Sequence, residues 1–127
     1  FGATTGRKRR CGWIDLPLLR YAVKCSQLSS IALTKLDILS GLSELKVCYA
    51  YEVNGKVVDC AYPGINLYNA KPLYKDLVPF KDDFEGGDCS KELQAYIDFI
   101  EEALGIPVGI YAYGPDRSQI VFRKQYA

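Results

Sequence analysis

The chain contains no histidine and no methionine, and it has a single tryptophan. The lack of histidine removes the Ser-His and Cys-His nucleophile pairs, the histidine-type zinc sites and the commonest general base. An enzyme limited to these 127 residues would therefore have few ways to move protons. Because methionine begins translation, its absence leads us to expect a piece of a longer protein.

Long apolar runs are also missing. No run approaches the ~20 residues that a membrane helix requires, so we expect no membrane span. The polar, basic N-terminus is not followed by an apolar stretch, so we expect no signal peptide. The five cysteines are an odd number without C-x-x-C spacing, which favours free thiols in a reducing cytoplasm. The net charge is only +1, so any basic patch must be local.

Two helices are predicted in what the length indicates is a single domain. Asp15 is the expected N-cap of a short amphipathic helix over residues 16–26, with Pro17 in its first turn. Ser90 is the expected N-cap of a second helix, in which apolar residues recur at intervals of three and four. Gly105 is expected to end that helix.

Several stretches predict β-strands. Ser30–Lys35 is a short apolar run typical of a strand buried on both faces in a parallel sheet. Leu45–Tyr62 alternates two sets of residues around Asn54-Gly55, which predicts a hairpin with Val47, Tyr49, Tyr51 and Val53 on one face. Further short strands are predicted near residues 73–77, 108–113 and 119–123, and an acidic surface loop over residues 82–88.

The order of helix, strand, hairpin, helix and strand indicates an α/β fold. Ligands in such folds bind beyond the carboxyl ends of strands. Two predicted strands end in polar loops, at Lys35-Leu36-Asp37 and at Gly114-Pro115-Asp116. We therefore expect a binding site at these two loops.

Asp37 follows the first of these strands. A carboxylate at that position can accept two parallel hydrogen bonds from guanine, which adenine cannot donate. The methylene stem of Lys35 can lie along the flat base. The pattern resembles the N-K-x-D element of GTP-binding proteins, with Thr34 in the place of asparagine. A charged strand end without a ligand is the alternative.

A basic loop precedes the first helix. Small residues from Thr4 onward lead into four consecutive cations, Arg7, Lys8, Arg9 and Arg10. Small residues let the backbone approach an anion, and a guanidinium binds carboxylate or phosphate with two hydrogen bonds. In an extended loop, Arg7 and Arg9 would turn inward while Lys8 and Arg10 face water. A solvated basic arm or a nucleic-acid patch is the alternative, although the net charge does not favour nucleic acid.

Four sequence blocks occur in one order: G-A-T-T-G-R-K-R-R-C-G-W-I-D, A-L-T-K-L-D-I-L-S-G-L, E-L-K-V-C-Y-A-Y and Y-G-P-D-R. Together they resemble the C-terminal third of adenylosuccinate synthase, from about residue 1 to residue 121. The resemblance implies the C-terminal part of a P-loop-NTPase-like mixed sheet with flanking helices and a β-hairpin. It also implies a cytoplasmic, homodimeric ligase that uses GTP and Mg²⁺ to join inosine monophosphate to L-aspartate, giving adenylosuccinate for AMP biosynthesis.

The resemblance implies two sets of binding residues and no catalytic residue in this chain. Aspartate and inosine monophosphate would be held by an aspartate loop within residues 1–10, at Ala3, Thr4, Thr5, Gly6, Arg7, Lys8 and Arg9. GTP would be held by Arg9 and by loops near residues 34–37 and 112–117, at Lys35, Leu36, Asp37, Ala112, Tyr113 and Gly114. The family usually has Ser-Thr-Gly where this chain has residues 112–114, so the resemblance predicts a lost hydroxyl contact at Ala112.

The rest of the family's machinery matches nothing in this sequence. Its glycine-rich phosphate loop, catalytic aspartate, catalytic histidine and magnesium ligands lie outside the matching part. We therefore expect no metal site in these residues and no catalysis by the chain alone, because stabilising a transferring phosphoryl group needs those parts. A stand-alone guanine-nucleotide-binding module without catalysis is the alternative.

Overall fold

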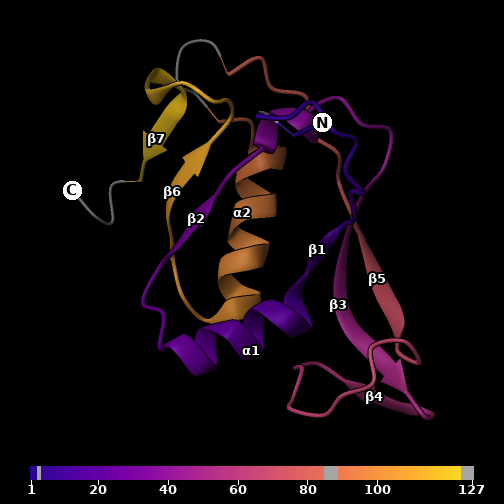
Figure 1. The fold of residues 1–127 in the computed structure, drawn as a ribbon. Helices are drawn as coiled ribbons and strands as arrows, with labels where there is room; N and C mark the ends of the chain where they lie inside the picture. Colours follow the sequence, from indigo (N-terminus) through magenta and orange to yellow (C-terminus); the bar gives the residue numbers. More distant parts are fainter. Residues whose placement is uncertain (3, 85–88, 124–127) are drawn as a thin grey trace.

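The computed structural model describes residues 1–2, 4–84 and 89–123, which form a mixed α/β arrangement (Figure 1). The α-helices are α1 (Leu16–Ser26) and α2 (Lys91–Leu104), and short 3-10 turns are η1 (Leu36–Ile38) and η2 (Arg117–Gln119). The strands are β1 (Ile14–Asp15), β2 (Ile31–Leu33), β3 (Leu45–Val53), β4 (Lys56–Val58), β5 (Lys71–Leu77), β6 (Val108–Ala112) and β7 (Ile120–Phe122). The predicted α/β class is confirmed.

The strands form two sheets, each with parallel and antiparallel pairs. In the first, β1 runs parallel to β3, and β3 pairs antiparallel with β4 and β5. In the second, β2 runs parallel to β6, and β6 pairs antiparallel with β7. The parallel pairing of β2 and β6 brings together the two loops that follow these strands, because parallel strands end at the same edge.

Both helices begin and end as the sequence predicts. The Asp15 carboxylate accepts a hydrogen bond from the Leu18 backbone N–H at 3.1 Å, and the Ser90 hydroxyl accepts one from the Leu93 N–H at 3.1 Å. Gly105 ends α2 in the left-handed region, at a φ of 69°. The caps satisfy backbone donors that a helix start leaves unpaired.

The main core lies where α2 packs between the two sheets (Figure 1). Ile97 and Ile100 of α2 are fully buried, as are Val47 of β3 and Val108 of β6. Burying an aliphatic side chain of this size contributes about 1.5–3 kcal/mol. The helix thus links the hairpin sheet to the sheet that carries the two predicted binding loops.

The prediction for residues 30–35 was partly wrong. Strand β2 covers only Ile31–Leu33, and its central residue Ala32 is exposed, so the strand is not buried on both faces. Leu33 packs into the core, whereas no element of the described chain covers Ala32. Lys35 then turns into the left-handed region at a φ of 65°, which ends the extended backbone and begins η1.

The hairpin is confirmed, but its alternation is interrupted. Asn54 and Gly55 form the turn, with φ angles of 51° and 77°. The pairing of β3 with β5 shifts register between Cys48 and Ala50, and Tyr49 at that point is 40% exposed. A bulge changes the direction in which the following side chains point. This explains why Tyr49 does not share the buried environment of Val47.

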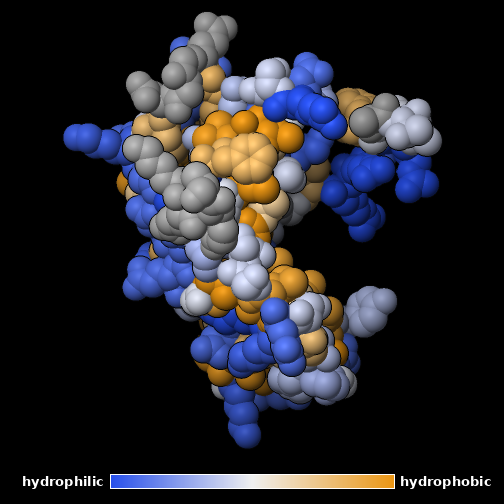
Figure 2. Space-filling view, turned by 90° about the vertical axis from the view of Figure 1, so that its left-hand side faces the viewer, coloured by the Kyte–Doolittle hydropathy of each residue, from blue (hydrophilic) through white to orange (hydrophobic). Residues whose placement is uncertain are grey.

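Figure 2 shows the side of the molecule on which the three-stranded sheet lies, where apolar surface is bordered by hydrophilic side chains. Strand β7 contributes exposed apolar residues, with Phe122 at 69% exposure. Within the part of the chain that is described, neither helix has the length and apolar character needed to cross a bilayer.

Candidate nucleotide- and anion-binding site

The two residues predicted to read a purine lie at the start of turn η1: Lys35 precedes the turn and Asp37 lies within it. Leu36 is 1% exposed and anchors the turn in the core, whereas Lys35 and Asp37 on either side of it are exposed. Because Leu36 is held in the core, the backbone positions of its two exposed neighbours, Lys35 and Asp37, are fixed as well. The turn therefore presents an ammonium group and a carboxylate next to the end of β2.

A cavity of about 830 Å³ lies on one side of this turn, which we call the base-side cavity. It brings Asp37 together with Tyr113, two residues from the two predicted GTP-binding loops. Its lining residues are Asp37, Ser40, Asp82, Asp83, Phe84, Tyr113, Ser118 and Gln119.

The second predicted loop is built around Gln119. The Gln119 side-chain oxygen accepts a hydrogen bond from the Asp116 N–H at 2.9 Å, and its carbonyl accepts one from the Tyr113 N–H at 3.1 Å. A Cβ on Gly114 would lie 2.1 Å from the same side-chain oxygen, so a larger residue there would force the Gln119 side chain to move. Ala112, at 9% exposure, is buried beneath this loop.

The basic loop folds back on itself rather than running extended. The Gly2 N–H donates to the Arg7 carbonyl at 2.8 Å, and the Gly6 N–H donates to the Gly2 carbonyl at 2.8 Å. The Arg9 guanidinium lies across Gly2, where an added Cβ would be 3.2 Å from its Nε. Gly6 has a φ of 63°, a conformation that glycine adopts without strain. Ala3, predicted to contact substrate, lies outside the described residues.

A second cavity, of about 990 Å³, lies between this loop and turn η1, and we call it the arginine-side cavity. Thr4, Arg9 and Arg10 line it together with Lys35 and Ile38. All the residues from Thr4 to Arg10 are exposed to solvent. Because the loop is folded, Arg10, expected to face water, also lines this cavity, whereas Arg7, expected to turn inward, does not line it.

Two groups outside the lining, Cys89 and Tyr111, interact electrostatically with Asp82 of the base-side cavity. Burial, and next the charge of Asp82, raise the pKa of the Cys89 thiol. Burial also raises the pKa of the Tyr111 phenol. Both groups therefore keep their protons near neutral pH. Among the described residues, no three His, Cys, Asp or Glu side chains converge as a metal site would require.

Sequence reasoning missed six residues of the base-side cavity: Ser40, Asp82, Asp83, Phe84, Ser118 and Gln119. Asp82 fell in a stretch interpreted as an acidic surface loop, and residues 85–88 of that stretch lie outside the described residues. Ser40 and Asp82 are 42 positions apart. No local pattern in the sequence signals that such distant residues meet.

Comparison with known proteins gives a consistent result. A family model described as adenylosuccinate synthetase matches residues 1–121. The adenylosuccinate synthetase of Francisella philomiragia is 51% identical over 98% of this chain, and that of Francisella tularensis subsp. mediasiatica is 50% identical over the same share. The chain spans 30% of the length of each relative.

A solved structure, described as fully ligated adenylosuccinate synthetase from Plasmodium falciparum, has a similar fold. It is 34% identical, with a TM-score of 0.85, over 98% of this chain and 31% of its own. The sequence comparison and the fold comparison therefore both point to adenylosuccinate synthetases.

Proposed function

Because the chain belongs to the adenylosuccinate synthetase family, we propose that it forms the guanine- and aspartate-binding part of a GTP-dependent ligase. The complete protein would join inosine monophosphate to L-aspartate and produce adenylosuccinate. Like the family it resembles, it would be a cytoplasmic homodimer.

One observation carries this proposal: turn η1 lies between the two cavities and contributes to both. Asp37 lines the base-side cavity with Tyr113, and Lys35 lines the arginine-side cavity with Arg9 and Thr4. Residues predicted to bind a purine and residues predicted to bind a carboxylate thus belong to adjoining spaces. A ligase that uses a nucleotide to activate one substrate for attack by another needs such neighbouring sites.

On the base side, Asp37 would accept hydrogen bonds from the ring N–H and the exocyclic amine of guanine. The stem of Lys35, which lines the arginine-side cavity, would cover the base from that side. The backbone around Tyr113 and Gly114 would border the edge of the base. The turn's buried anchor, Leu36, limits how far the carboxylate can move. A fixed carboxylate disfavours adenine, because a polar group left unpaired on binding costs free energy.

On the arginine side, Arg7 and Arg9 would hold the carboxylates of aspartate, and Thr4, Thr5 and Gly6 would contact the same substrate. Lys8 would add positive charge to this loop, and Ala3 would belong to the same contact surface. Arg9, which shares its cavity with Lys35, would also lie next to GTP. Guanidinium groups suit this task because they bind carboxylates with paired hydrogen bonds.

The implied Mg²⁺ does not fit the residues described, since no set of three acidic, cysteine or histidine side chains converges among them. We derive no step through the ion. The ligands for Mg²⁺ and the groups that stabilise phosphoryl transfer would come from other parts of the protein.

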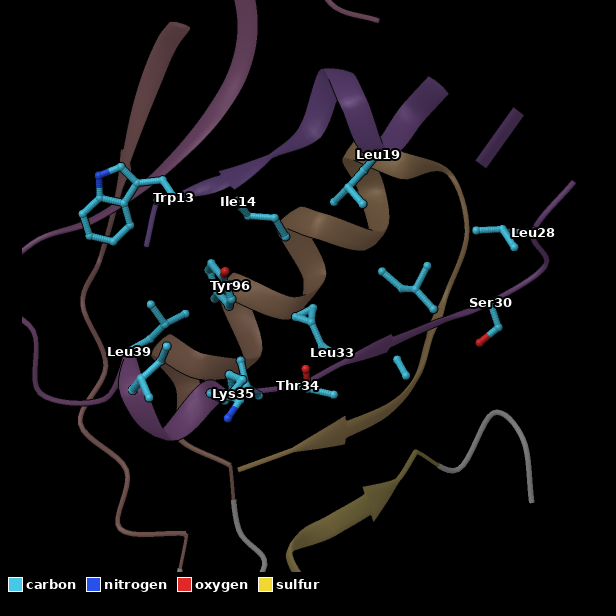
Figure 3. A pocket seen from close by; sticks show the side chains of 15 residues that line it. Trp13, Ile14, Leu19, Leu28, Ser30, Leu33, Thr34, Lys35, Leu39 and Tyr96 are labelled. Carbon is cyan, nitrogen blue, oxygen red and sulfur yellow. The ribbon is translucent and has the colours of Figure 1, made fainter. Parts of the chain in front are cut away.

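The two sheets support a larger, P-loop-NTPase-like sheet in the complete protein. Among the described strands, β1 pairs only with β3, and β2 pairs only with β6. The other edge of β1 and the other edge of β2 both face an apolar groove of about 550 Å³. Figure 3 shows side chains of this groove, including Trp13, Leu33 and Tyr96, between β1 and β2 and over α2. Strands from outside these 127 residues would join the two sheets there.

The test joins residues 1–127 to the part of the Francisella philomiragia relative that this chain does not match; we call the product the joined protein. We expect it to form adenylosuccinate from GTP, inosine monophosphate and aspartate, and Arg7→Ala to raise the KM for aspartate at least about tenfold. Arg117→Ala, on the other loop, is the matched control.

Three results separate the alternatives. Guanine-nucleotide binding without synthesis by the joined protein would favour the stand-alone binding module. Synthesis by the 127-residue chain alone would refute the assignment of the catalytic groups to other parts. Binding that responds only to salt and not to the base would favour the basic arm.

A further inference from the structure

The segment between β5 and α2 contacts one loop predicted to bind GTP, at Tyr113, and the residues just after the other, at Ser40 and Gly41. We define residues 80–84 as the bridge segment. Its residues 82–84 were interpreted from sequence as part of an acidic surface loop, yet Phe84 is only 9% exposed. Phe80, which precedes that stretch, is 2% exposed. The bridge segment is therefore part of the folded core around the base-side cavity.

On one side, the bridge segment is fastened to the residues just after Asp37. The Ser40 hydroxyl donates to the Asp82 carbonyl at 2.8 Å and accepts from the Asp82 N–H at 2.9 Å. The Gly41 N–H donates to the Phe80 carbonyl at 2.9 Å. Three hydrogen bonds thus join two segments about forty residues apart. None of the three involves the Asp37 side chain.

On the other side, the bridge segment stacks against the second loop. The rings of Phe84 and Tyr113 lie 4.7 Å apart, with 6° between their planes. Phe84 adopts a φ of 58°, which is costly for a residue with a large side chain. Such a conformation persists where the surroundings hold it, and here the stacked ring of Tyr113 is one such contact.

The rest of the segment is fixed to α2. The Phe80 ring lies 5.9 Å from the Tyr96 ring, and the Asp82 carboxylate accepts a hydrogen bond from the Ser90 N–H at 3.3 Å. The bridge segment is thus attached to a buried helix and reaches from there to both loops.

We propose that the bridge segment holds the two base-reading loops at a fixed separation, with Ser40 and Phe84 as its positioning residues for guanine-nucleotide binding. This rests on the proposed function, because it assumes that Asp37 and Tyr113 border the nucleotide. Without either attachment, a smaller fraction of molecules has both loops in the binding arrangement. The apparent affinity for GTP falls by that fraction.

In the joined protein, we expect Ser40→Ala to raise the KM for GTP about tenfold while the KM for aspartate changes less than about twofold. Ser40→Thr keeps the hydroxyl and should stay within about threefold of the unaltered protein. Tyr51→Phe is the matched control, since it removes another part-buried hydroxyl, one that donates to the Asp15 carboxylate in the hairpin sheet and does not contact the bridge segment. A purely stabilising role would make the Ser40→Ala and Tyr51→Phe variants behave alike, which would overturn the proposal.

A second readout does not depend on activity. In the 127-residue chain, Ser40→Ala should speed amide hydrogen exchange at Gly41 and Asp82, and also at Tyr113 across the stack, about tenfold. Conversely, Phe84→Ala, which removes the stack on Tyr113, should speed amide exchange at Gly41 on the other side of the bridge segment. Exchange at Ile97 in α2 should stay unchanged.

The two readouts keep the hypotheses apart. If the joined protein is active but Ser40→Ala leaves the KM for GTP unchanged, the bridge is refuted and the ligase assignment stands. If the joined protein is inactive, the exchange at Tyr113 decides: acceleration supports the bridge, and an unchanged rate overturns it.

Discussion

The basic loop and the base-side loops differ in how they are held. Hydrogen bonds of the described basic-loop residues join Gly2 to Arg7 and Gly6 to Gly2, within the loop itself. The base-side loops are joined to distant segments, as Ser40 is to Asp82. The base-side loops are therefore fixed by contacts with the rest of the fold. The described part of the basic loop is held mainly by hydrogen bonds within the loop. We infer that the base is read by a preorganised surface, whereas aspartate orders much of its own site.

The largest expected difference concerns Asp37. In the joined protein, Asp37→Asn should reduce the preference for GTP over ATP at least about 100-fold, or about 2.7 kcal/mol, because the amide cannot accept both guanine hydrogen bonds. Steady-state kinetics with each nucleotide measure this. Asp116→Asn, in the other loop, serves as the control. A preference that survives Asp37→Asn would remove the base-side loop from guanine recognition.

An effect of similar size, on stability and not on binding, is expected at high pH through Tyr96, whose ring lies 5.9 Å from that of Phe80 in the bridge segment. Burial raises the pKa of Tyr96 to about 12. The folded protein therefore keeps a proton that the unfolded chain loses near pH ~10, so stability is complete below that pH and falls as pH rises towards about 12. The loss should reach about 2–3 kcal/mol.

Urea unfolding across this pH range measures the change, and Tyr96→Phe should flatten part of the slope. The buried Tyr111 phenol, with its raised pKa, contributes in the same direction and should keep some slope in that variant. A Tyr96→Phe protein with the same pH dependence as the unaltered chain would contradict the role of Tyr96.

The same substitution in the two regions should give unequal results. Gly114→Ala places a Cβ 2.1 Å from the Gln119 side chain, whose capping bond holds the loop, and should cost about 1–3 kcal/mol. Gly2→Ala meets the end of the flexible Arg9 side chain at 3.2 Å and should cost less than about 0.5 kcal/mol.

Thermal or urea unfolding measures both glycine variants. In a Gly114→Ala/Gln119→Ala double variant the clash is gone, so the double variant should be no less stable than Gln119→Ala alone. Equal costs at Gly2 and Gly114 would mean that the two regions are held equally firmly.

Local signals in the sequence predicted much of the fold. Asp15, Ser90 and Gly105 act within one turn of the chain, and Asn54-Gly55 sets its own backbone angles, so these elements could be predicted from short stretches. The exposed face of Ala32 could not, because burial depends on what covers a strand. The bulge at Tyr49 also depends on a partner strand.

The candidate site divides in the same way. Lys35 and Asp37 were found because a local motif places them two positions apart at a strand end. The bridge segment was missed because Ser40, Asp82 and Phe84 come together only through tertiary contacts. The folded shape of the basic loop, which brings Arg10 to a cavity, depends on hydrogen bonds that composition does not reveal.

Titration of the joined protein with the diphosphates of guanosine, inosine and adenosine tests most directly whether Asp37 reads guanine. Inosine lacks the exocyclic amine, so we predict binding about tenfold weaker for inosine diphosphate than for guanosine diphosphate, and weaker again for adenosine diphosphate. In Asp37→Asn, the guanosine and inosine forms should bind almost equally. Equal binding of all three nucleotides by the unaltered protein would contradict the account.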